Sequence, residues 1–312
     1  MTTLVAAEKL SRRFGEGGWF SPTPVQAVTD VSLSLDRGQA VALVGESGSG
    51  KTTLGRMLLG LLPPSAGRVS FDGIDLAIAG AAQRRQLRRR MQIVFQDPQS
   101  SLDPRRTVGA QIADGLEIHN IVRSADRRAR VSELLSQVGL SSVHADRYPH
   151  QFSGGQRQRI GIARALATEP EFLLADEPVS SLDVSVQAQV LDLLADLRTR
   201  LGLALLFISH DLAVARSLCE RVAVMYLGRV METGPVAQVF NAPRHPYTQA
   251  LLSAVPKLDP GQRRSRILLP GDPPSPAEPP SGCVFRTRCP IAIDACAAAV
   301  PPLIDGVACI RL

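Results

Sequence analysis

The sequence is poor in lysine and in aromatic residues. Lys9, Lys51 and Lys257 are its only lysines, so the formal net charge of +6 comes almost entirely from arginine. Aromatic residues make up 4% of the chain, and none is interleaved with the densest arginine cluster, at 84–90. Single-stranded nucleic acid is usually bound by basic residues combined with aromatic stacking platforms. We therefore interpret most arginines as solvated surface residues and expect no nucleic-acid partner.

The sequence also lacks a long apolar run. A membrane-spanning helix needs roughly 18 or more consecutive apolar residues, and no such run occurs in the chain. The opening residues, MTTLVAAEKLSRRF, contain no apolar core followed by a small-residue cleavage site, which a secretory signal would show. These absences exclude a membrane span and a secretory leader from our interpretation, and we expect the chain to stay in the cytoplasm.

Short apolar runs alternate with amphipathic segments along most of the chain. This alternation predicts an α/β fold in which a parallel sheet is covered by helices. A mostly helical insertion is expected over residues 107–150. The predicted strands are 24–34, 39–44, 69–71, 92–95, 172–175 and 203–209, and the predicted helices are 52–62, 156–167 and 184–201.

A phosphate-binding loop follows the second predicted strand. The segment matches the pattern GxxxxGK[ST] and lies between a strand and a helix, the context that this motif requires. Backbone N–H groups of such a loop surround phosphate, the lysine reaches the β- and γ-phosphates, and the following hydroxyl ligates Mg²⁺. No internal repeat is present, so we expect a single nucleotide-binding unit. The candidate ATP-binding residues are Gly45, Glu46, Ser47, Gly48, Ser49, Gly50, Lys51, Thr52 and Thr53.

Two acidic residues end the predicted strand at 172–175. Ligands of open α/β sheets bind at the carboxyl ends of the strands, which is where Asp176 and Glu177 lie. We expect Asp176 to belong to the magnesium shell and Glu177 to polarise an attacking water. A surface carboxylate pair would show the same pattern, but the phosphate loop favours the catalytic interpretation.

A second candidate anion-binding element opens the predicted helix at 156–167. Ser153, Gly154, Gly155 and Gln156 provide a hydroxyl, glycine N–H groups and a helix N-terminus, all of which suit a phosphate. One nucleotide does not need two such elements from one chain. We therefore expect this turn to act on the nucleotide of a partner subunit.

These motifs together resemble the ATP-binding cassette (ABC) family of transporter ATPases. The resemblance spans roughly residues 1–240 and also covers Gln96, the segment Ser181-Leu182-Asp183, and His210. Phe152 stands where the family usually has leucine, a swap that keeps an apolar anchor. The resemblance implies a P-loop NTPase fold of ABC type, with a parallel core sheet, an antiparallel β subdomain and a helical subdomain at about 97–165.

The resemblance also implies roles for individual residues. Gln96 would touch the magnesium ion together with Thr52 and Asp176, and His210 would contact the γ-phosphate and orient the water. The cassettes would pair head to tail, with Ser181, Leu182 and Asp183 at the interface. An aromatic ring would stack on adenine. Phe14 is our candidate for that ring, and Trp19 and Phe20 are its competitors.

The last seventy residues resemble the C-terminal extension of oligopeptide and dipeptide importers and their nickel-transporting relatives. The similarity rests on the segments at 241–252 and 282–290, which flank a proline-rich stretch at 257–282. We therefore divide the chain into an ABC nucleotide-binding domain at 1–240 and a small cysteine-containing extension at 241–312.

Four of the five cysteines lie in this extension. Their spacing, C-x5-C-x6-C-x12-C, lacks the C-x2-C pair that is usual in zinc knuckles. Four thiolates, one of them followed by proline, suit an iron–sulfur cluster, and some members of the importer family carry [4Fe–4S] there. Zinc and reduced thiols remain alternatives. The cysteine at 219 is expected to pack as a small apolar residue. The expected cluster ligands are Cys283, Cys289, Cys296 and Cys309.

The resemblance implies a magnesium-dependent ATPase that energises an importer, with di- or oligopeptides as the expected cargo. Its partners would be two integral membrane subunits, a second ABC ATPase that is identical or paralogous, and indirectly a substrate-binding protein. It would lie on the cytoplasmic face of the bacterial inner membrane. Nickel chelates, glutathione and other cargoes remain alternatives. A soluble ABC ATPase of translation or DNA repair is disfavoured, because those types carry two cassettes or long insertions.

Overall fold

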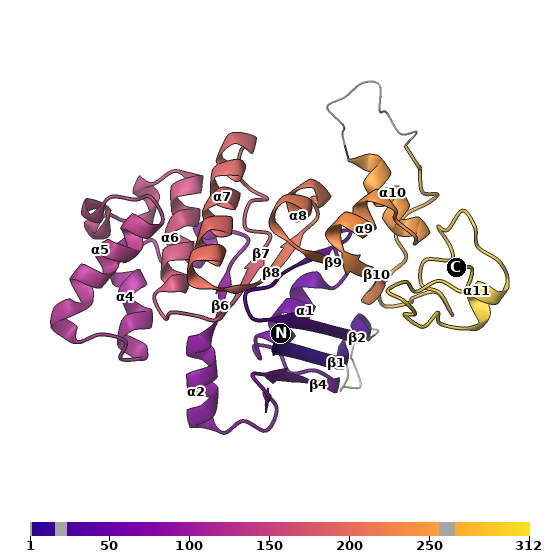
Figure 1. The fold of residues 1–312 in the computed structure, drawn as a ribbon, viewed down its shortest axis with the longest axis horizontal. Coiled ribbons are helices and arrows are strands. Elements are labelled where there is room, and N and C mark those ends of the chain that lie inside the picture. Colours follow the sequence, from indigo (N-terminus) through magenta and orange to yellow (C-terminus); the bar gives the residue numbers. More distant parts are fainter. Residues whose placement is uncertain (1, 16–23, 256–265) are drawn as a thin grey trace. The chain divides into compact units, whose positions relative to one another are not determined.

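The computed structural model describes residues 2–15, 24–255 and 266–312. They form two compact units, which we treat separately. Figure 1 labels the helices and strands of the chain. The helical unit comprises Met1–Leu4, Leu35–Gln39 and Ile78–Ile208, and the loop unit comprises Val5–Ser34, Ala40–Ala77 and Ser209–Leu312. The chain therefore leaves and re-enters each unit more than once.

The helical unit is built on three parallel strands, β6 (Met91–Val94), β7 (Phe172–Asp176) and β8 (Ala204–Ser209). Every residue of β7 and β8 is buried, so these strands read as continuous apolar runs without alternation. The helices of this unit are α2 (Ala81–Arg90), α3 (Pro98–Ser101), α4 (Val108–Ile118), α5 (Arg127–Gln137), α6 (Gly154–Leu166) and α7 (Val184–Leu201), with short 3₁₀ turns at Ser124–Asp126, Ser142–Asp146 and Pro149–Gln151.

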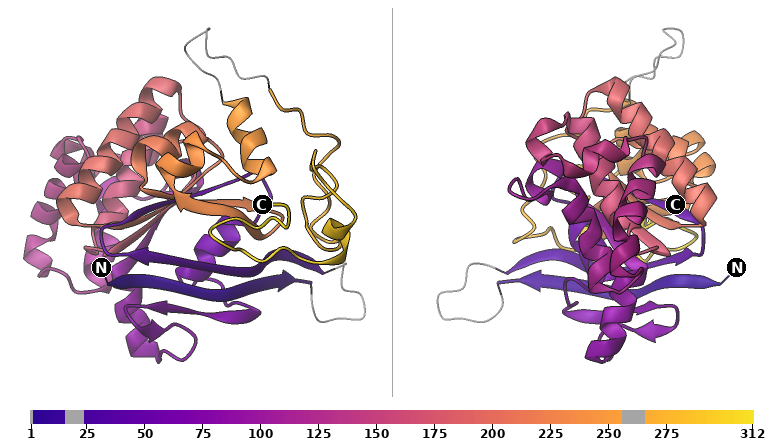
Figure 2. Two further views of the ribbon diagram at one scale, coloured as in Figure 1. Left: turned by 45° about the vertical axis from the view of Figure 1, so that its right-hand side comes forward. Right: turned by 90° about the vertical axis from the view of Figure 1, so that its left-hand side faces the viewer.

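The loop unit contains most of a four-stranded sheet and three further strands. The sheet has the order β2-β1-β4-β5, in which β4 pairs antiparallel with both β1 and β5 (Figure 2). In the second group, β3 and β9 are parallel, and β10 pairs antiparallel with β9. The strands are β1 (Thr3–Phe14), β2 (Val25–Asp36), β3 (Ala40–Val44), β4 (Ala66–Phe71), β5 (Ile74–Asp75), β9 (Arg221–Tyr226) and β10 (Arg229–Pro235).

Five helices belong to the described part of the loop unit. Of these, α1 (Lys51–Leu58) follows the phosphate loop, and α8 (Leu212–Leu218) lies between β8 and β9. The helices α9 (Val236–Asn241), α10 (Pro246–Ala254) and α11 (Ala295–Ala298) follow β10. The parallel core strands, the antiparallel subdomain and the helical insertion that we predicted are thus all present.

One predicted helix is too long. We expected residues 52–62, but α1 ends at Leu58. Gly60 has a φ of 64°, a left-handed conformation that stops the helix, and Leu61 N–H then donates to Arg56 O at 2.9 Å. The glycine, rather than the two prolines after it, ends this helix.

The C-terminal extension is part of the loop unit and does not separate as a compact unit of its own. Thr233 N–H donates to Gly306 O at 2.7 Å, and Ala308 N–H donates to Met231 O at 2.9 Å, so the end of the chain continues the edge of β10.

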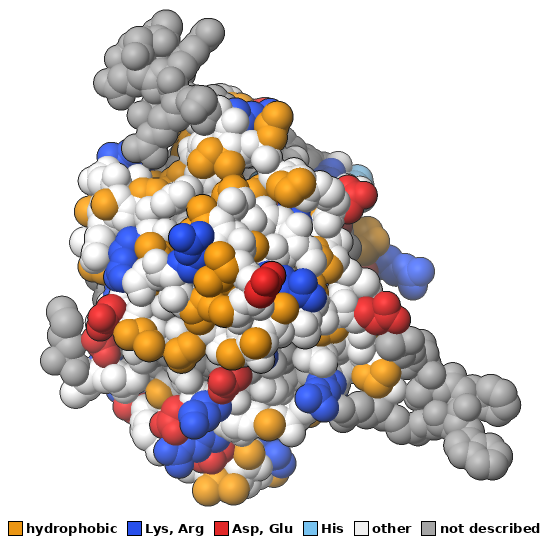
Figure 3. All heavy atoms as spheres, turned by 90° about the vertical axis from the view of Figure 1, so that its right-hand side faces the viewer, with side chains coloured by type: hydrophobic (Ala, Val, Ile, Leu, Met, Phe, Trp, Pro, Cys, Tyr) orange, Lys and Arg blue, Asp and Glu red, His pale blue; other side chains and the backbone are white. Residues whose placement is uncertain are grey.

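Hydrophobic side chains on the face in Figure 3 are interspersed with charged ones. Within the described ranges, none of the helices is long and apolar enough to cross a membrane.

Candidate functional site

The phosphate loop connects β3 to α1 in a conformation that only glycine tolerates at two points. Gly45 has a φ of 151°, and a Cβ there would lie 2.1 Å from Met225 O. Gly50 has a φ of 98° and caps α1, and its Cβ would lie 2.1 Å from Ala27 O. Both contacts are with backbone atoms, which cannot move aside. The glycines of the motif are therefore needed for close backbone packing as well as for the turn.

Lys51 lies under this loop and is 4% exposed. Its ammonium donates to Gly45 O at 2.9 Å, Glu46 O at 2.8 Å and Ser49 Oγ at 3.4 Å. The loop thus surrounds its own lysine. These contacts compensate the burial of the charge and hold the lysine under the loop that is expected to receive phosphate.

Glu46, the second residue of the loop, is held from the C-terminal extension. Its backbone N–H donates to Tyr247 Oη at 3.0 Å, and its carboxylate accepts from Arg288 Nη1 at 3.0 and 3.2 Å. Burial raises the pKa of Tyr247 well above its ordinary value, so the hydroxyl stays protonated. Tyr247 and Arg288 are contacts of the loop that sequence reasoning missed, because they follow Glu46 by 201 and 242 residues.

In the helical unit, Gln96, Asp176 and Glu177 lie at the carboxyl ends of β6 and β7. Asp176 is the last residue of β7 and is 3% exposed. Gln96 Nε2 donates to Glu177 Oε2 at 3.0 Å, an arrangement that leaves the amide oxygen of Gln96 for another contact. The structure thus brings together two of the side chains that we expected at the reaction centre.

Glu177 also has an unusual backbone. Its φ is 45°, its N–H donates to Ile208 O at 3.0 Å, and its carbonyl accepts from Ser180 Oγ at 3.1 Å. A left-handed conformation is uncommon for a residue other than glycine, asparagine or aspartate, and such residues cluster at functional sites. The conformation and the contact with Gln96 are independent observations that single out this carboxylate.

The serine–glycine turn opens α6 as predicted. Ser153 is the N-cap: its Oγ accepts from Gln156 N–H at 3.3 Å, while Gln156 Oε1 accepts from Ser153 N–H at 3.0 Å. This reciprocal capping box stabilises the helix start. Ser153 and Gly154 are exposed, and Gly155 is buried against Val186 of α7, where an added Cβ would lie 2.2 Å from a methyl group. The turn is thus anchored by Gly155 and open at Ser153.

The segment Ser181-Leu182-Asp183 precedes α7. Asp183 is the N-cap of this helix, and its Oδ1 accepts from Ser185 Oγ at 2.7 Å and Val186 N–H at 3.0 Å. The hydrogen bond from Ser185 is the main cause that lowers the pKa of Asp183, so its carboxylate is ionised at neutral pH. Within one chain this aspartate therefore already has a structural role.

The remaining candidates lie in the loop unit. Phe14 ends β1, is 38% exposed, and has the Arg12 guanidinium 4.8 Å from its ring centroid. Its competitors, Trp19 and Phe20, lie outside the described residues. His210 is exposed between β8 and α8, and Thr52 and Thr53 are half-buried in the first turn of α1. Thr52 is thus in the loop unit, whereas the other two expected magnesium ligands are in the helical unit.

Comparison with known proteins decides the family. Residues 28–180 match the model of the ABC transporter family, and residues 231–296 match that of the oligopeptide/dipeptide transporter C-terminal region. The dipeptide transport ATP-binding protein DppF of Escherichia coli is 50% identical over 92% of this chain and 86% of its own length. The chain belongs to the ABC transporter ATPases of the oligopeptide/dipeptide type. The oligopeptide transport ATP-binding protein AppF of Bacillus subtilis is 50% identical over 89% of this chain and 85% of AppF. A provisionally named peptide import ATP-binding protein of Brucella ovis is 58% identical over 89% of this chain and 88% of its own length.

Solved ABC ATPases share the fold. The dimeric, post-hydrolysis structure of the ATP-binding cassette MJ0796 with ADP and Pi is 30% identical and covers 75% of this chain and 99% of MJ0796, with a TM-score of 0.67. CbiO1 of Clostridium perfringens, part of the transporter complex CbiONQ, is 29% identical and covers 78% of this chain and 92% of CbiO1, with a TM-score of 0.68. The predicted ABC-type ATPase fold is therefore confirmed.

The structure of this ABC ATPase gives no support for the cysteine ligand set that we expected. None of the five cysteines forms a disulfide within the described ranges, and Cys219 is buried as predicted. Burial raises the pKa of Cys283, and the nearby thiols of its three neighbours in the extension raise it further. The four thiols are thus near one another. However, among the described residues no three His, Cys, Asp or Glu side chains are arranged to hold a metal ion.

His245 is structural. It is 2% exposed, and its Nδ1 accepts from Tyr247 N–H at 3.1 Å, which caps α10. Its own backbone N–H donates to Glu232 Oε2 at 3.0 Å. Burial lowers the pKa of His245 to about 4, so the ring is neutral at pH 7 and can accept this hydrogen bond.

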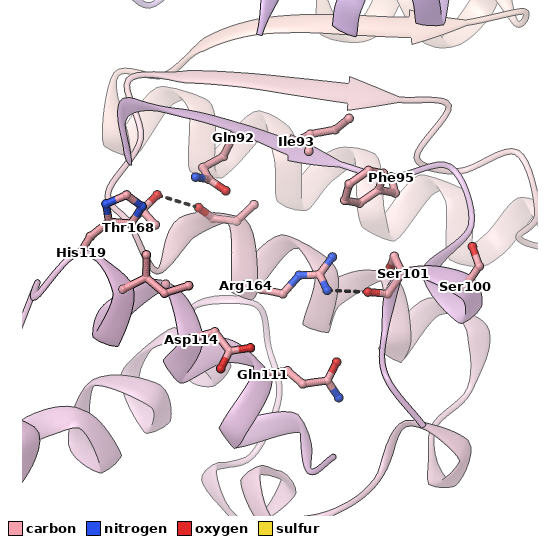
Figure 4. A pocket seen from close by; sticks show the side chains of 13 residues that line it. Gln92, Ile93, Phe95, Ser100, Ser101, Gln111, Asp114, His119, Arg164 and Thr168 are labelled. Atoms are coloured by element: carbon pink, nitrogen blue, oxygen red, sulfur yellow. Dashed lines mark hydrogen bonds between the residues drawn. The ribbon is translucent and has the colours of Figure 1, made fainter. Parts of the chain in front are cut away.

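A pocket of about 640 Å³ opens in the helical unit (Figure 4). Residues from β6, α3, α4 and α6 line it, among them Phe95, Ile118 and Arg164. The Arg164 side chain extends across the pocket in Figure 4 and donates to Ser101 O. Burial lowers the pKa of Arg164, and Asp114 partly offsets the shift. The pocket therefore has a lining of mixed apolar and polar residues, and its Arg164 is partly desolvated.

Proposed function

We propose that this chain is the ATP-hydrolysing subunit of a peptide importer, with di- or oligopeptides as cargo. The observation that carries the proposal is the combination of an ABC cassette with an oligopeptide/dipeptide-type C-terminal region in one chain. The names of the relatives DppF and AppF support the same class of cargo. Nickel chelates, glutathione and other cargoes are the alternatives.

In this proposal the phosphate loop binds ATP. Lys51 neutralises charge on the β- and γ-phosphates, and the loop N–H groups surround them. Thr52, Gln96 and Asp176 would hold Mg²⁺, which supplies charge neutralisation when bound. Hydroxyl, amide oxygen and carboxylate are the oxygen donors that Mg²⁺ prefers, so the residues fit the ion. Phe14 would stack on the adenine, which its exposure permits.

Glu177 is the proposed base that polarises the attacking water. Its contact with Gln96 at 3.0 Å and its left-handed backbone support this role. His210 would orient the water and contact the γ-phosphate. Phosphoryl transfer needs positioning and charge stabilisation more than covalent chemistry, which is why an amide, a carboxylate and an imidazole suffice.

Two cassettes would pair head to tail, so that Ser153, Gly154, Gly155 and Gln156 meet ATP on the partner. The exposure of Ser153 and its place at the N-terminus of α6 support this arrangement. Ser181, Leu182 and Asp183 would lie at the same interface. The partner cassette is identical or, as we favour, a paralogue.

We further propose that two integral membrane permeases bind the helical unit, at the cytoplasmic face of the bacterial inner membrane. A substrate-binding protein would deliver cargo to them from the other side. The pocket in Figure 4 fits a short amphipathic helix of a permease, because its lining mixes apolar side chains with polar ones and Arg164 can meet a carboxylate or a helix C-terminus.

A transport assay tests the proposed function. The chain is co-expressed with the membrane proteins of the neighbouring genes, reconstituted into lipid vesicles, and supplied with ATP, a binding protein and labelled dipeptides. We expect peptide uptake that depends on ATP and is abolished by Lys51→Ala but not by Lys9→Ala, which replaces an exposed lysine of β1. Uptake of nickel chelates or glutathione in place of peptides would overturn the cargo.

A pair of variants tests the permease pocket. Ile118→Asp places a charge in the pocket lining, whereas Val143→Asp places one at another exposed apolar residue of the helical unit, outside the pocket. We expect the first to reduce co-purification with the permeases about tenfold and the second to leave it unchanged, because burying an unpaired charge opposes binding. Equal loss for both variants would contradict the proposed pocket.

For the four cysteines of the extension we propose an iron–sulfur cluster. The mutual effect of the thiols on the pKa of Cys283 supports it, and the lack of a ready ligand set among the described residues counts against it. Anaerobic purification followed by iron and acid-labile sulfide assays decides whether the cluster is present. About four irons and four sulfides per chain would establish the cluster, and a stable, colourless and iron-free protein would exclude it.

A further inference from the structure

Glu46 is the meeting point of the phosphate loop and the C-terminal extension. Its carbonyl accepts from Lys51 at 2.8 Å, its N–H donates to Tyr247 at 3.0 Å, and its carboxylate binds Arg288 at 3.0 and 3.2 Å. Three different groups of one residue are thus engaged. Two of the three partners come from the extension rather than from the cassette.

The two extension residues are rigidly placed. Tyr247 is fully buried, and Arg288 is 8% exposed. The rings of Tyr226, Tyr247 and Phe285 pack against one another with centroids 4.8 to 5.3 Å apart, a close aromatic cluster. Phe285 precedes Arg288 by three residues, so this cluster fixes both side chains that hold Glu46. All of these residues belong to the loop unit.

The contact of Arg288 is not explained by stability alone. A single nitrogen, Nη1, makes both contacts with Glu46, and it lies 3.5 Å from Tyr226 Oη. The buried Nε has no hydrogen-bond partner among the described residues. An unsatisfied buried donor costs stability, so this geometry offsets part of what the ion pair contributes. The pair is therefore better explained by its effect on Glu46.

The effect of Arg288 on Glu46 is electrostatic. Glu46 places a carboxylate inside a loop that is proposed to bind a polyphosphate, and like charges repel strongly where solvent screening is reduced. Arg288 neutralises this carboxylate and turns it toward the extension. Tyr247 meanwhile fixes the direction of the Glu46 N–H, and with it the first turn of the loop.

We propose that Arg288 and Tyr247 are positioning residues of the nucleotide site, which hold the phosphate loop through Glu46 so that the C-terminal extension sets the affinity for ATP. The inference rests on the proposed ATP-binding role of the loop. It assigns the extension a direct part in nucleotide binding and names the residues that transmit it.

The test is a double-mutant cycle on the full chain. Binding of the non-hydrolysable analogue AMP-PNP with Mg²⁺ is measured by isothermal titration calorimetry, and KM for ATP is measured alongside. We expect Arg288→Gln to raise the Kd and the KM about tenfold, with a much smaller change in kcat, because Glu177 and Gln96 are untouched. When Glu46→Gln is already present, the same substitution should have little further effect, because the charge that needs neutralising is gone.

Matched variants separate positioning from folding. Arg286→Gln alters an arginine of the same segment whose side chain donates to Ser281 instead, and it should bind AMP-PNP like the wild type. Arg288→Lys keeps the charge and should retain most of the affinity. Tyr247→Phe removes one hydroxyl from the aromatic cluster and should weaken binding a few-fold. Thermal unfolding confirms that each variant is folded. If the Arg288→Gln chain does not fold, the test uses two other chains. The AMP-PNP affinity of Arg288→Lys is then compared with that of the chain that carries both Arg288→Gln and Glu46→Gln.

Two outcomes would overturn the inference. One is a folded Arg288→Gln chain with wild-type affinity, and the other is an equal loss whether or not Glu46→Gln is present. Lys51→Ala distinguishes this failure from failure of the proposed function. If Lys51→Ala still binds AMP-PNP, the loop is not the nucleotide site, whereas if it does not bind and Arg288→Gln does, only the role of the extension is wrong.

Discussion

The phosphate loop and the serine–glycine turn are both proposed to bind ATP, yet they are built in opposite ways. The loop surrounds a buried lysine, and Glu46 within it is tied to the extension. The turn exposes Ser153 to solvent, and the hydroxyl of this serine takes part in a capping box within α6. The loop is thus organised by its own chain, whereas the turn has a surface that is completed from outside.

The loop and the turn therefore gain their stability in different ways. A buried cation must be paired within the fold, so the loop is supported even before a nucleotide arrives. A helix N-terminus can remain solvated, because water satisfies its free N–H groups until an anion replaces the water. We therefore expect substitutions at the loop to act within one chain and substitutions at the turn to act on the partner.

The largest expected effect is on hydrolysis itself. Glu177→Gln removes the proposed base but preserves the hydrogen-bonding shape of the side chain. We expect ATP binding to persist and turnover to fall about 1000-fold, within the range for loss of a general base. Phosphate release measured at saturating ATP checks this. Near wild-type turnover would mean that Glu177 is not the base.

The next prediction tests the comparison directly, by mixing two inactive variants. Lys51→Ala disables the loop and Ser153→Arg blocks the turn, so each variant alone should lose about 100-fold or more in ATPase rate. In a head-to-tail pair of the two, one site keeps both an intact loop and an intact turn. At equal mixing, about a quarter of the wild-type rate should return, because half the pairs are mixed and each has one intact site.

Controls keep this experiment interpretable. Light scattering must show that two copies of the chain pair at the concentration used. Ser136→Arg, at an exposed serine of α5, should retain activity alone. Failure of the mixture to recover any activity would contradict head-to-tail pairing, and the loop and the turn would then have to act within one chain.

A smaller effect should distinguish the two regions by pH. The pKa of His245 is about 4 in the folded chain and 6.5 for an ordinary histidine. The unfolded chain therefore binds more protons as the pH falls below 6.5, and the folded state loses stability through that window. Between about pH 7.5 and about pH 5 this histidine should cost about 2 kcal/mol of unfolding free energy. Stability is regained as the pH rises back through this window.

The matched variant is His245→Asn, which can still cap α10 but does not titrate. Denaturant unfolding of both chains at the two ends of this pH range gives the difference that belongs to His245. Because His245 lies in the loop unit, we expect acid to lower the stability of that unit, which holds the phosphate loop, and to leave the serine–glycine turn of the helical unit intact. An equal pH dependence in the two chains would show that His245 does not titrate as its burial implies.

The turn and the loop were predictable from sequence because local physics defines them. Gly45, Gly50 and Lys51 lie within one short segment, and Ser153 and Gln156 are separated by one helical turn. By contrast, β1 was missed because its pattern does not alternate. A register shift between Glu8 and Ser11 and a positive φ of 49° at Lys9 interrupt the period of two.

Two other features lay beyond sequence reasoning for different reasons. Helix α2 buries only Leu87, so its arginines indicated a charged surface but gave no apolar periodicity. The contact between Glu46 and Arg288 joins residues 242 positions apart, and no local pattern encodes such a pairing. The cysteine spacing suggested a ligand set, but spacing alone does not determine whether the backbone arranges four thiols around a metal.

The last prediction concerns the packing that holds the serine–glycine turn in place. A Cβ at Gly155 would lie 2.2 Å from a Val186 methyl group, so Gly155→Ala should force α6 and α7 apart and destabilise the chain by about 2 kcal/mol. Gly161→Ala, in the same helix, meets no atom within 4 Å and should be neutral or stabilising by up to about 1 kcal/mol. Denaturant unfolding measures both, and Val186→Ala should rescue Gly155→Ala by removing the clashing methyl. If Gly155→Ala is instead as stable as Gly161→Ala, then Gly155 is not needed for packing, and only a role in contacting the partner's nucleotide would be left for it.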